Sequence, residues 1–341
     1  MDAIWWITTH LAPERCTSDK FFYDAMESQS EYGLPVIYKA FDPGKAWHWD
    51  DRGRILDYLF ATHGQGARLL DFGPGDGWPS LPVAPFAGEV VGVDASARRV
   101  QVCAGNAARM GINNARFVHI PAVGPLPFED ESFDGVMAAT SIEQTPDPRE
   151  ALREIYRVLR PGGRLRMDYE GLGCYRGGKE REVWLLDMGE ACRLIIYDRH
   201  VEQERADEYG LDLSMAVGEV ASWLTGRAGA TAASEGMAVG IEHVTPDALD
   251  ALRPVITGAW VCTLSHPSGA TYARWLREIG FSVVRPTHNG GHFARKLFGS
   301  MLPEDRPTSL EGVTELLSPL VQVVVEMPAP IEMDPMITAV K

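Results

Sequence analysis

Three glycines and a downstream aspartate form the stretch of this chain whose residue types and spacing point most directly to chemistry. The apolar run Arg68–Phe72 ends in a loop, GPGDG, at 73–77, and a second apolar run, Glu89–Val93, ends in Asp94. Glycines remove side chains where a backbone must approach a ligand closely or adopt a positive φ. An aspartate at a strand tip can accept hydrogen bonds from both hydroxyls of a ribose. The pattern predicts a nucleoside-type cofactor at the carboxyl ends of parallel strands.

The spacing of the loop favours one nucleoside cofactor over another. The dinucleotide fingerprint is G-x-G-x-x-G, whereas this loop reads G-x-G-x-G and continues into Trp78. Asp76 inside the loop would repel a pyrophosphate, so an NAD-type oxidoreductase is the less favoured interpretation. Asp71, just before the loop, adds a carboxylate that could hold an ammonium group. S-adenosylmethionine, a cation with an amino-acid end and a ribose, fits this acidic loop better.

With the residues DFGPGDG at 71–77 and Asp94, the sequence resembles the class I S-adenosylmethionine-dependent methyltransferases, with a core like that of their small-molecule "type 11" members. Two more segments resemble the same family. They are LPFEDESFD at 126–134, before the fourth strand, and REALREIYRVLRPGGRLRM at 149–167. The resemblance implies S-adenosylmethionine as cofactor, S-adenosylhomocysteine as product and a methyltransferase activity.

The segment that contacts adenine in this family departs from the usual pattern. The family usually places an acid a few residues before Leu-Pro-Phe, where it binds the adenine amino group, but residues 121–124 read PAVG here. Backbone groups and apolar side chains, such as Ile120, would then contact the adenine. The residues expected to bind the cofactor are Asp71, Phe72, Gly73, Pro74, Gly75, Gly77, Trp78, Asp94, Ala95, Ala122, Val123, Thr140 and Ser141.

Methyl transfer from a sulfonium depends mainly on orientation and proximity, and a base is needed only if the nucleophile arrives protonated. Candidates lie where strands end or where loops could bring a base. The candidate catalytic residues are Tyr169 and Glu170 after the fifth strand, beside Asp168, and His288 and His292 around a Gly-Gly pair. The candidate substrate contacts are Tyr32, Tyr38, Trp47 and Glu143. No metal is expected, because Gly290-Gly291 argues against a helix that would align the two histidines.

The order of the elements predicts an α/β fold, a Rossmann-like, doubly wound and mostly parallel seven-stranded sheet. The regions expected are an aromatic N-terminal cap or lid at 1–50, a cofactor-binding core at 51–170, an insertion at 171–262 and the remainder of the core at 263–341, with an expansion at 285–335. The insertion is longer than an ordinary loop. We expect it to serve substrate selection or a dimer contact.

The composition of the chain restricts the classes of molecule that it is expected to bind. The 341 residues carry a formal net charge of −15, and no dense run of Lys or Arg occurs, so nucleic acid is an unlikely partner. The chain shows no signal peptide and no membrane-spanning run, so a cytoplasmic protein is expected. The family's N/D-P-P-Y motif is absent after the fourth strand, which favours a small-molecule acceptor with an O, N, S or C nucleophile. The alternative is a non-catalytic cofactor-binding or scaffold protein, and a homodimer is possible.

Overall fold

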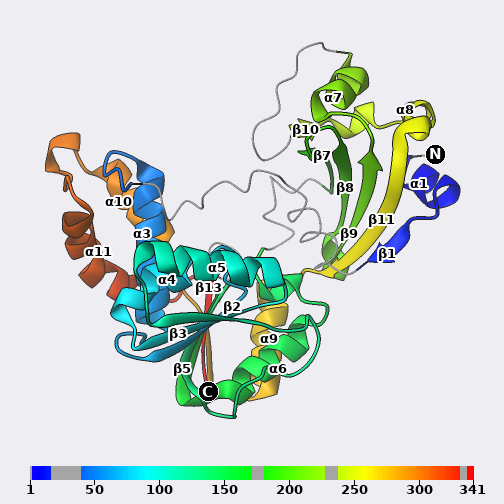
Figure 1. Cartoon of the computed structure of the whole chain (residues 1–341). Helices are drawn as coiled ribbons and strands as arrows, with labels where there is room; N and C mark the ends of the chain where they lie inside the picture. The colour runs from blue at the N-terminus through cyan, green and yellow to red at the C-terminus, as the bar shows by residue number, and fades with distance from the viewer. Residues whose placement is uncertain (1, 17–39, 171–179, 227–236, 331–335) are drawn as a thin grey trace. The chain divides into compact units, whose positions relative to one another are not determined.

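The structure, a computed structural model, describes residues 2–16, 40–170, 180–226, 237–330 and 336–341. The chain divides into two compact units. The core unit comprises Leu34–Glu170 and Pro267–Lys341, and the accessory unit comprises Met1–Gly33 and Gly171–His266. Each unit has its own sheet (Figure 1).

The core unit contains a seven-stranded sheet in the order β12-β13-β6-β5-β2-β3-β4. Its strands are β2 (Arg68–Phe72), β3 (Glu89–Asp94), β4 (Ala115–His119), β5 (Phe133–Ala139), β6 (Leu159–Asp168), β12 (Val283–Pro286) and β13 (Met336–Val340). Only β13 runs antiparallel to its neighbours, β6 and β12. The predicted α/β class, with a mostly parallel seven-stranded sheet, is confirmed.

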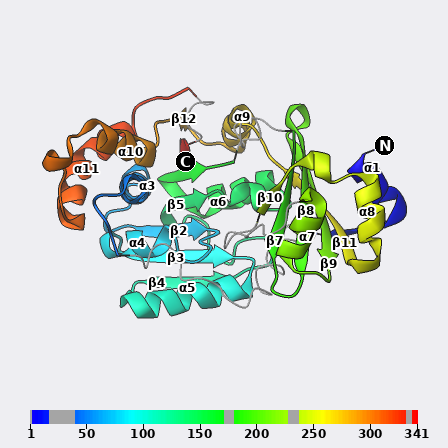
Figure 2. The ribbon, with the colours of Figure 1, turned by 90° about the horizontal axis from the view of Figure 1, so that it is seen from above.

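Helices cover both faces of the core sheet (Figures 1 and 2). They are α3 (Ala46–Ala61), α4 (Ser80–Val83), α5 (Ala97–Met110), α6 (Pro148–Val158) and α9 (Gly269–Ile279), and the 3-10 turn η2 (Ala84–Phe86) follows α4. Side chains of α3 and α4 pack with Leu69 and Val90, whereas those of α6 and α9 pack with Leu70 and Leu165. Adjacent residues of a strand face opposite sides of the sheet, so these helix pairs cover opposite faces.

Local signals place the helices that surround the glycine loop. Ser96 accepts a hydrogen bond from the backbone of Arg99 (3.2 Å) and caps α5, and Gly111 ends that helix with a φ of +67°. Asp147 caps α6 and Pro148 is its first residue. These features are typical of helix starts and stops, and they fix the ends of both helices within a few residues.

The C-terminal expansion adds α10 (Gly290–Ser300) and α11 (Leu310–Val324), which pack on α3. The prediction that Gly290-Gly291 breaks a helix is wrong, because both residues open α10. Asn289 caps this helix by accepting from the backbone of Gly291 (2.8 Å), and Asp57 accepts from the backbone of Gly290 (2.7 Å). These bonds satisfy amide groups that a helix start leaves open, and they offset the low helix propensity of glycine.

The accessory unit has a six-stranded sheet in the order β1-β11-β9-β8-β7-β10. Its elements are α1 (Ala3–His10), β1 (Glu14–Cys16), β7 (Arg181–Asp187), β8 (Cys192–His200), η5 (Val201–Gln203), β9 (Arg205–Leu213), α7 (Val217–Thr225), β10 (Met237–Val239), η6 (Ile241–His243), α8 (Pro246–Leu252) and β11 (Ile256–Ser265). The three helices bury an apolar cluster with strand residues such as Leu194 and Leu211. The apolar runs 183–186 and 193–197 lie in β7 and β8, and residues 218–224 lie in α7.

Candidate functional site

The glycine loop follows the carboxyl end of β2 and has the backbone geometry that only glycine adopts without strain. Gly73, Gly75 and Gly77 have φ values of +77°, +58° and +111°. A Cβ at Gly73 would lie 2.5 Å from the Cβ of Ser141, and one at Gly77 would lie 2.5 Å from Cδ1 of Leu81. A Cβ at Gly75 would meet nothing closer than 3.8 Å. The loop is therefore packed tightly at both ends, and its middle leaves open space over bare backbone.

Asp94 ends β3, the strand next to the loop strand. Its carboxylate is 3% exposed, and Oδ1 accepts a hydrogen bond from the backbone of Ser96 (2.9 Å). Oδ2 is buried and makes no hydrogen bond of good geometry among the described residues, although the backbone N–H of Gly75 lies near enough to lower the pKa of this carboxylate. Burial raises the pKa of Asp94, although the amide of Ser96 and the guanidinium of Arg99 oppose this rise. A buried acceptor without a well-placed partner is costly, and a donor from a bound molecule would satisfy it.

Asp71 lies in β2, directly before the loop. Its carboxylate, a candidate to hold the ammonium group of the cofactor, is fully buried below the loop. Its Oδ2 accepts from both the backbone (3.1 Å) and the hydroxyl (2.5 Å) of Ser80, the first residue of α4. Burial raises the pKa of Asp71 to about 7, against the opposing effect of the Ser80 bonds. In this position Asp71 fixes the helix that follows the loop.

The end of β5 is bound to the neighbouring strands on both sides. The hydroxyl of Ser141 donates to the carbonyl oxygen of Phe72, which joins this segment to the glycine loop. The backbone of Thr140 donates to Oδ1 of Asp168 (2.8 Å), and the hydroxyl of Tyr58 donates to the same oxygen (3.0 Å). Asp168 is thus occupied with holding β5, β6 and α3 together.

Glu143 lies in the 3-10 turn η3 (Ile142–Gln144) after β5, and its side chain is fully buried. Oε1 accepts from the backbone of Glu170 at the end of β6 (2.9 Å). Oε2 has no hydrogen-bond partner among the described residues. Burial raises the pKa of Glu143 to about 8, and the negative charges of Asp168 and Glu170 add to this rise. At neutral pH the group therefore carries a proton for most of the time.

The remaining cofactor candidates share the same edge of the core sheet. Pro74 and Trp78 belong to the loop region, Ala95 follows β3, and Ala122 and Val123 follow β4. Ala122 is half-buried, whereas Val123 is 67% exposed. Because parallel strands end at one edge, the structure brings these positions to the side of the sheet where the glycine loop and Asp94 lie.

The catalytic and substrate candidates are more scattered. Tyr169 is buried against the ring of Tyr272 (centroids 5.0 Å apart), and Glu170 is exposed. His288 and His292 follow β12, two strands beyond β6. Both histidine side chains are half-buried, and the carbonyl of His288 accepts from a buried arginine (3.0 Å). Among the described residues, no three His, Cys, Asp or Glu side chains are grouped so that they could hold a metal ion.

Two of the aromatic candidates cannot be placed. Tyr32 and Tyr38 lie outside the described residues. Trp47 lies in the first turn of α3, where its ring meets the ring of His48 with centroids 3.8 Å apart. It forms part of the wall of a cavity in the helical layer of the core unit.

Several residues that support the site carried no signal in the sequence. Asn106 in α5 donates to the carbonyl of Asp76 (2.7 Å) and so holds the loop from outside. The guanidinium of Arg166 in β6 is fully buried and makes a two-pronged ion pair with Asp57 in α3 (2.6 and 2.7 Å). It also donates to the hydroxyls of Thr287 and Thr338. These partners are far apart in sequence, so no local pattern could reveal them.

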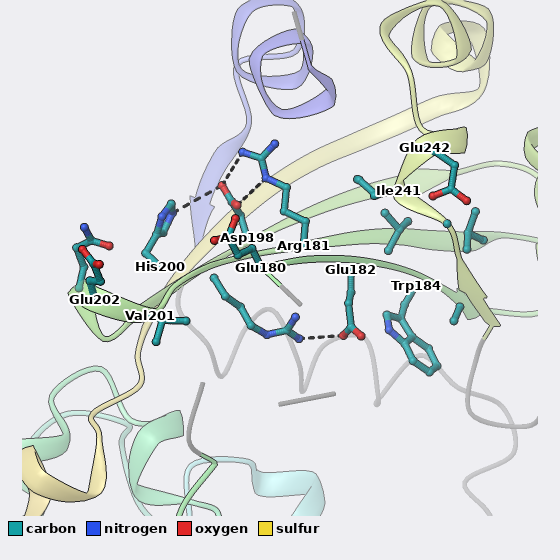
Figure 3. A pocket seen from close by; sticks show the side chains of 16 residues that line it. Glu180, Arg181, Glu182, Trp184, Asp198, His200, Val201, Glu202, Ile241 and Glu242 are labelled. Carbon is teal, nitrogen blue, oxygen red and sulfur yellow. Dashed lines mark hydrogen bonds and ion pairs between the residues drawn. The ribbon is translucent and has the colours of Figure 1, made fainter. Parts of the chain in front are cut away.

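The accessory unit carries a cleft of about 1070 Å³, which lies beside β7 and β10 (Figure 3). Arg199 pairs with Glu182 (3.1 Å) and Arg181 pairs with Asp198 (2.7 Å). Figure 3 shows the Arg181–Asp198 pair on one side of the ribbon and Glu182 on the other, with Trp184 next to Glu182. Carboxylates outnumber guanidinium groups among the residues that line this cleft.

Comparisons with known proteins give the same assignment for the core. Residues 70–167 match the methyltransferase domain family. The uncharacterized methyltransferase YcgJ of Bacillus subtilis (strain 168) is 39% identical over 98 residues, which is 29% of this chain and 38% of that protein. A demethylmenaquinone methyltransferase of Clavibacter sepedonicus is 38% identical over 100 residues, which is 29% of this chain and 40% of that protein. This chain thus spans less than half the length of these relatives.

Among solved structures, the CcbJ methyltransferase from Streptomyces caelestis aligns with 85% of this chain and 94% of its own, at 14% identity and a TM-score of 0.47. The family match runs from β2 to β6 and so contains the glycine loop, Asp94 and Glu143. The segment 70–167 is therefore a methyltransferase domain of the class I S-adenosylmethionine-dependent family.

Proposed function

We propose that this protein transfers a methyl group from S-adenosylmethionine to an O, N, S or C nucleophile of a small metabolite. One observation carries the proposal: open space over the bare backbone of Gly75 lies at the same strand edge as the unsatisfied Oδ2 of Asp94. A ribose presents hydroxyl donors, and a nucleoside needs close backbone approach, so these two features fit the cofactor. They lie inside a segment that matches methyltransferase domains.

Different residues of the core unit would contact different parts of the cofactor. Asp94 would accept from the ribose, and the backbone of the glycine loop would lie against the methionine part. Ile120, Ala122 and Val123 would border the adenine through backbone and apolar contacts. When bound, S-adenosylmethionine supplies an activated methyl group on a cationic sulfur. Orientation and proximity then account for most of the rate, as in other displacement reactions.

The position of Glu143 suits a role in binding or deprotonating the methyl acceptor. It lies between the ends of β5 and β6, and its Oε2 is unsatisfied among the described residues. A carboxylic acid with a pKa near 8 can donate a hydrogen bond to an acceptor oxygen or nitrogen, or take up its proton in a basic medium. Tyr169 and Glu170 at the end of β6, and His288 and His292 after β12, are further candidates for a base.

We further propose that the accessory unit selects the acceptor. The two relatives named above align over 29% of this chain, so the substrate implied by the name demethylmenaquinone methyltransferase does not transfer directly. The cleft beside β7 offers an indole side chain and paired charges, features that suit a small polar molecule. No helix in the described part of the chain is long and apolar enough to cross a membrane.

Calorimetric titration with S-adenosylmethionine, S-adenosylhomocysteine and NAD tests the cofactor. We expect the first two to bind with micromolar affinity and NAD not to bind. Tight NAD binding would refute the proposal. If the protein bound S-adenosylhomocysteine but transferred a labelled methyl group to no metabolite of a broad panel, a scaffold protein would be favoured instead. Once an acceptor is found, Trp184→Ala should raise its KM, whereas Trp223→Ala, an exposed tryptophan of α7 outside the cleft, should not.

A further inference from the structure

A second cavity lies in the helical layer of the core unit. It has a volume of about 380 Å³ and is bordered by α3, α4, η2 and the ends of α5 and α11. Its lining residues are Phe41, Trp47, His48, Asp51, Arg52, Ile55, Leu81, Pro82, Pro85, Phe86, Met110 and Leu310. Small-molecule sites typically have volumes in this range and a mostly apolar lining with few polar groups.

Four exposed apolar side chains converge on this cavity from four different elements. Trp47, Phe86, Met110 and Leu310 come from α3, η2, α5 and α11, and each is between 36% and 41% exposed. Single exposed apolar residues are common, but a convergent group usually marks a binding surface. Their meeting at one cavity therefore indicates a ligand with an apolar body.

The apolar rim of the cavity lies away from the edge where methyl transfer would occur, although Leu81 and Asp51 reach the glycine loop. Phe86 lies shortly before the first residue of β3, and Met110 lies shortly before the first residue of β4. Asp94, in contrast, is the last residue of β3. Because these strands are parallel, the rim formed by Phe86 and Met110 belongs to the amino edge of the sheet, and the proposed cofactor site belongs to the carboxyl edge.

The polar groups of the cavity specify the charge of the ligand. Arg52 donates from Nε to the hydroxyl of Thr314 (2.8 Å), and its guanidinium lies 5.5 Å from the centre of the Phe86 ring, where its positive charge offsets part of the negative charge of Asp51. Asp51 is the one carboxylate among the described lining residues. Burial raises the pKa of Asp51 against the opposing effects of Trp78, Arg54 and Arg52, and a further cation beside this carboxylate would stabilise its charged form. Aromatic walls such as Trp47 also attract cations.

We propose that this cavity is a binding site for a small aromatic amine, whose ring lies among the apolar walls and whose ammonium group meets Asp51. The chain's net charge of −15 would favour the approach of a cation over that of an anion. The site goes beyond the methyl-transfer activity and does not require it.

The same cavity is joined to the glycine loop by direct packing. Leu81 lines the cavity, and its side chain also fills the space beside Gly77, where a Cβ would lie 2.5 Å from its Cδ1. The backbone of Leu81 donates to the carbonyl of Gly77 (2.8 Å). The indole N–H of Trp78 and the guanidinium of Arg54 act on Asp51, where they oppose the rise of its pKa. A ligand in the cavity would press on Leu81, so we expect it to change the affinity of the loop for the cofactor.

Tryptamine is the probe, with indole-3-acetate as its anionic counterpart and 3-methylindole as its neutral one. Calorimetry or ligand-observed NMR on the full chain should show tryptamine binding at least about ten-fold tighter than indole-3-acetate, a difference of about 1.4 kcal/mol. Asp51→Asn should remove the advantage of tryptamine over 3-methylindole. Equal binding of all three probes, or no binding of tryptamine at millimolar concentration, would overturn the proposal.

Variants that fill the cavity locate the site. Leu310→Trp and Met110→Trp, made separately, should each weaken tryptamine binding about ten-fold or more. Leu302→Trp is the matched control, because Leu302 is exposed and does not line the cavity. Circular dichroism confirms that each variant is folded. If both filling variants bind tryptamine as the control does, the amine binds elsewhere and the assignment is wrong.

The coupling has a separate readout. Saturating tryptamine should change the dissociation constant of S-adenosylhomocysteine about three-fold or more in the unmodified chain and not in Leu310→Trp. An unchanged constant would refute the coupling. Failure of the methyltransferase assignment would look different, because S-adenosylhomocysteine would then not bind while tryptamine still did.

Discussion

Replacing Asp94 with alanine should weaken the binding of S-adenosylmethionine strongly while leaving the protein folded. Oδ1 of this carboxylate makes one internal hydrogen bond, to the backbone of Ser96 (2.9 Å), and Oδ2 makes none of good geometry among the described residues. A hydrogen bond to a charged group contributes about 1.5–3 kcal/mol. The loss of the ribose contact should therefore raise the dissociation constant roughly 10- to 150-fold.

Isothermal titration with S-adenosylhomocysteine at constant pH and salt measures this change directly. Asp94→Asn is the informative companion variant, because it keeps the oxygen that Ser96 needs and places an amide where the second oxygen was. We expect it to bind almost as poorly as the alanine variant, since an NH₂ group cannot accept from a hydroxyl. Both variants should unfold at temperatures close to that of the unmodified chain. Unchanged affinity in either variant would refute the assignment of Asp94 to the ribose.

Three more variants test the site and its support. Gly75→Ala should fold with a penalty of about 1–2 kcal/mol for its positive φ and should lose cofactor affinity in titration, because its methyl group would occupy the open space over the loop. Glu143→Gln keeps the oxygen that accepts from Glu170. As pH rises from about 4.5 to about 8, this variant should gain thermal stability relative to the unmodified chain. In that pH range the Glu143 carboxyl of the unmodified chain keeps its proton when folded and loses it when unfolded, which favours unfolding. Asp57→Asn leaves Arg166 buried without its charge partner and should cost about 3–5 kcal/mol in chemical denaturation.

Each of these has a clear contrary result. A Gly75 variant that binds the cofactor normally would move the cofactor away from the loop, and a pH-independent stability difference would mean that Glu143 is ionised in the folded state. For the buried ion pair the matched control is Arg149→Ala at the surface, where loss of the pair with Glu278 should cost less than about 1 kcal/mol. Equal costs for the buried and the surface pair would contradict the structural role of Asp57.

The sequence predicts the core unit well because its signals are local. The glycine loop, the cap at Ser96 and the start at Asp147-Pro148 each fix an element within a few residues. Pairing between segments that are distant in the sequence has no local sequence signal of this kind. The parallel pairing of β1 with β11 joins residues on either side of the whole core segment, and the pair Asp57–Arg166 joins a helix to a strand 109 positions away.

The wrong prediction at Gly290-Gly291 has a similar origin. Glycine lowers helix propensity, but α10 crosses α3 so closely that side chains cannot fit between them. A Cβ on Gly53 of α3 would overlap the carbonyl of Gly290, and a Cβ on Gly291 would overlap the side chain of Asp50. These glycines allow α3 and α10 to cross closely, and the packing between the two helices outweighs the low helix propensity of glycine. Only knowledge of the neighbouring helix could have revealed this.

The order of the strands has a consequence for how the chain is made. β13 pairs with β6 and β12 in the core sheet, so this sheet stays incomplete until residues 336–340 have left the ribosome. β1, near the start, must wait for β11. The core sheet can therefore close only after β13 has emerged, whereas the accessory sheet can close once β11 has emerged, and pairings over such long separations form slowly. Until then the nascent chain should expose unpaired strand edges, and its yield in cells should depend on chaperones and on growth temperature.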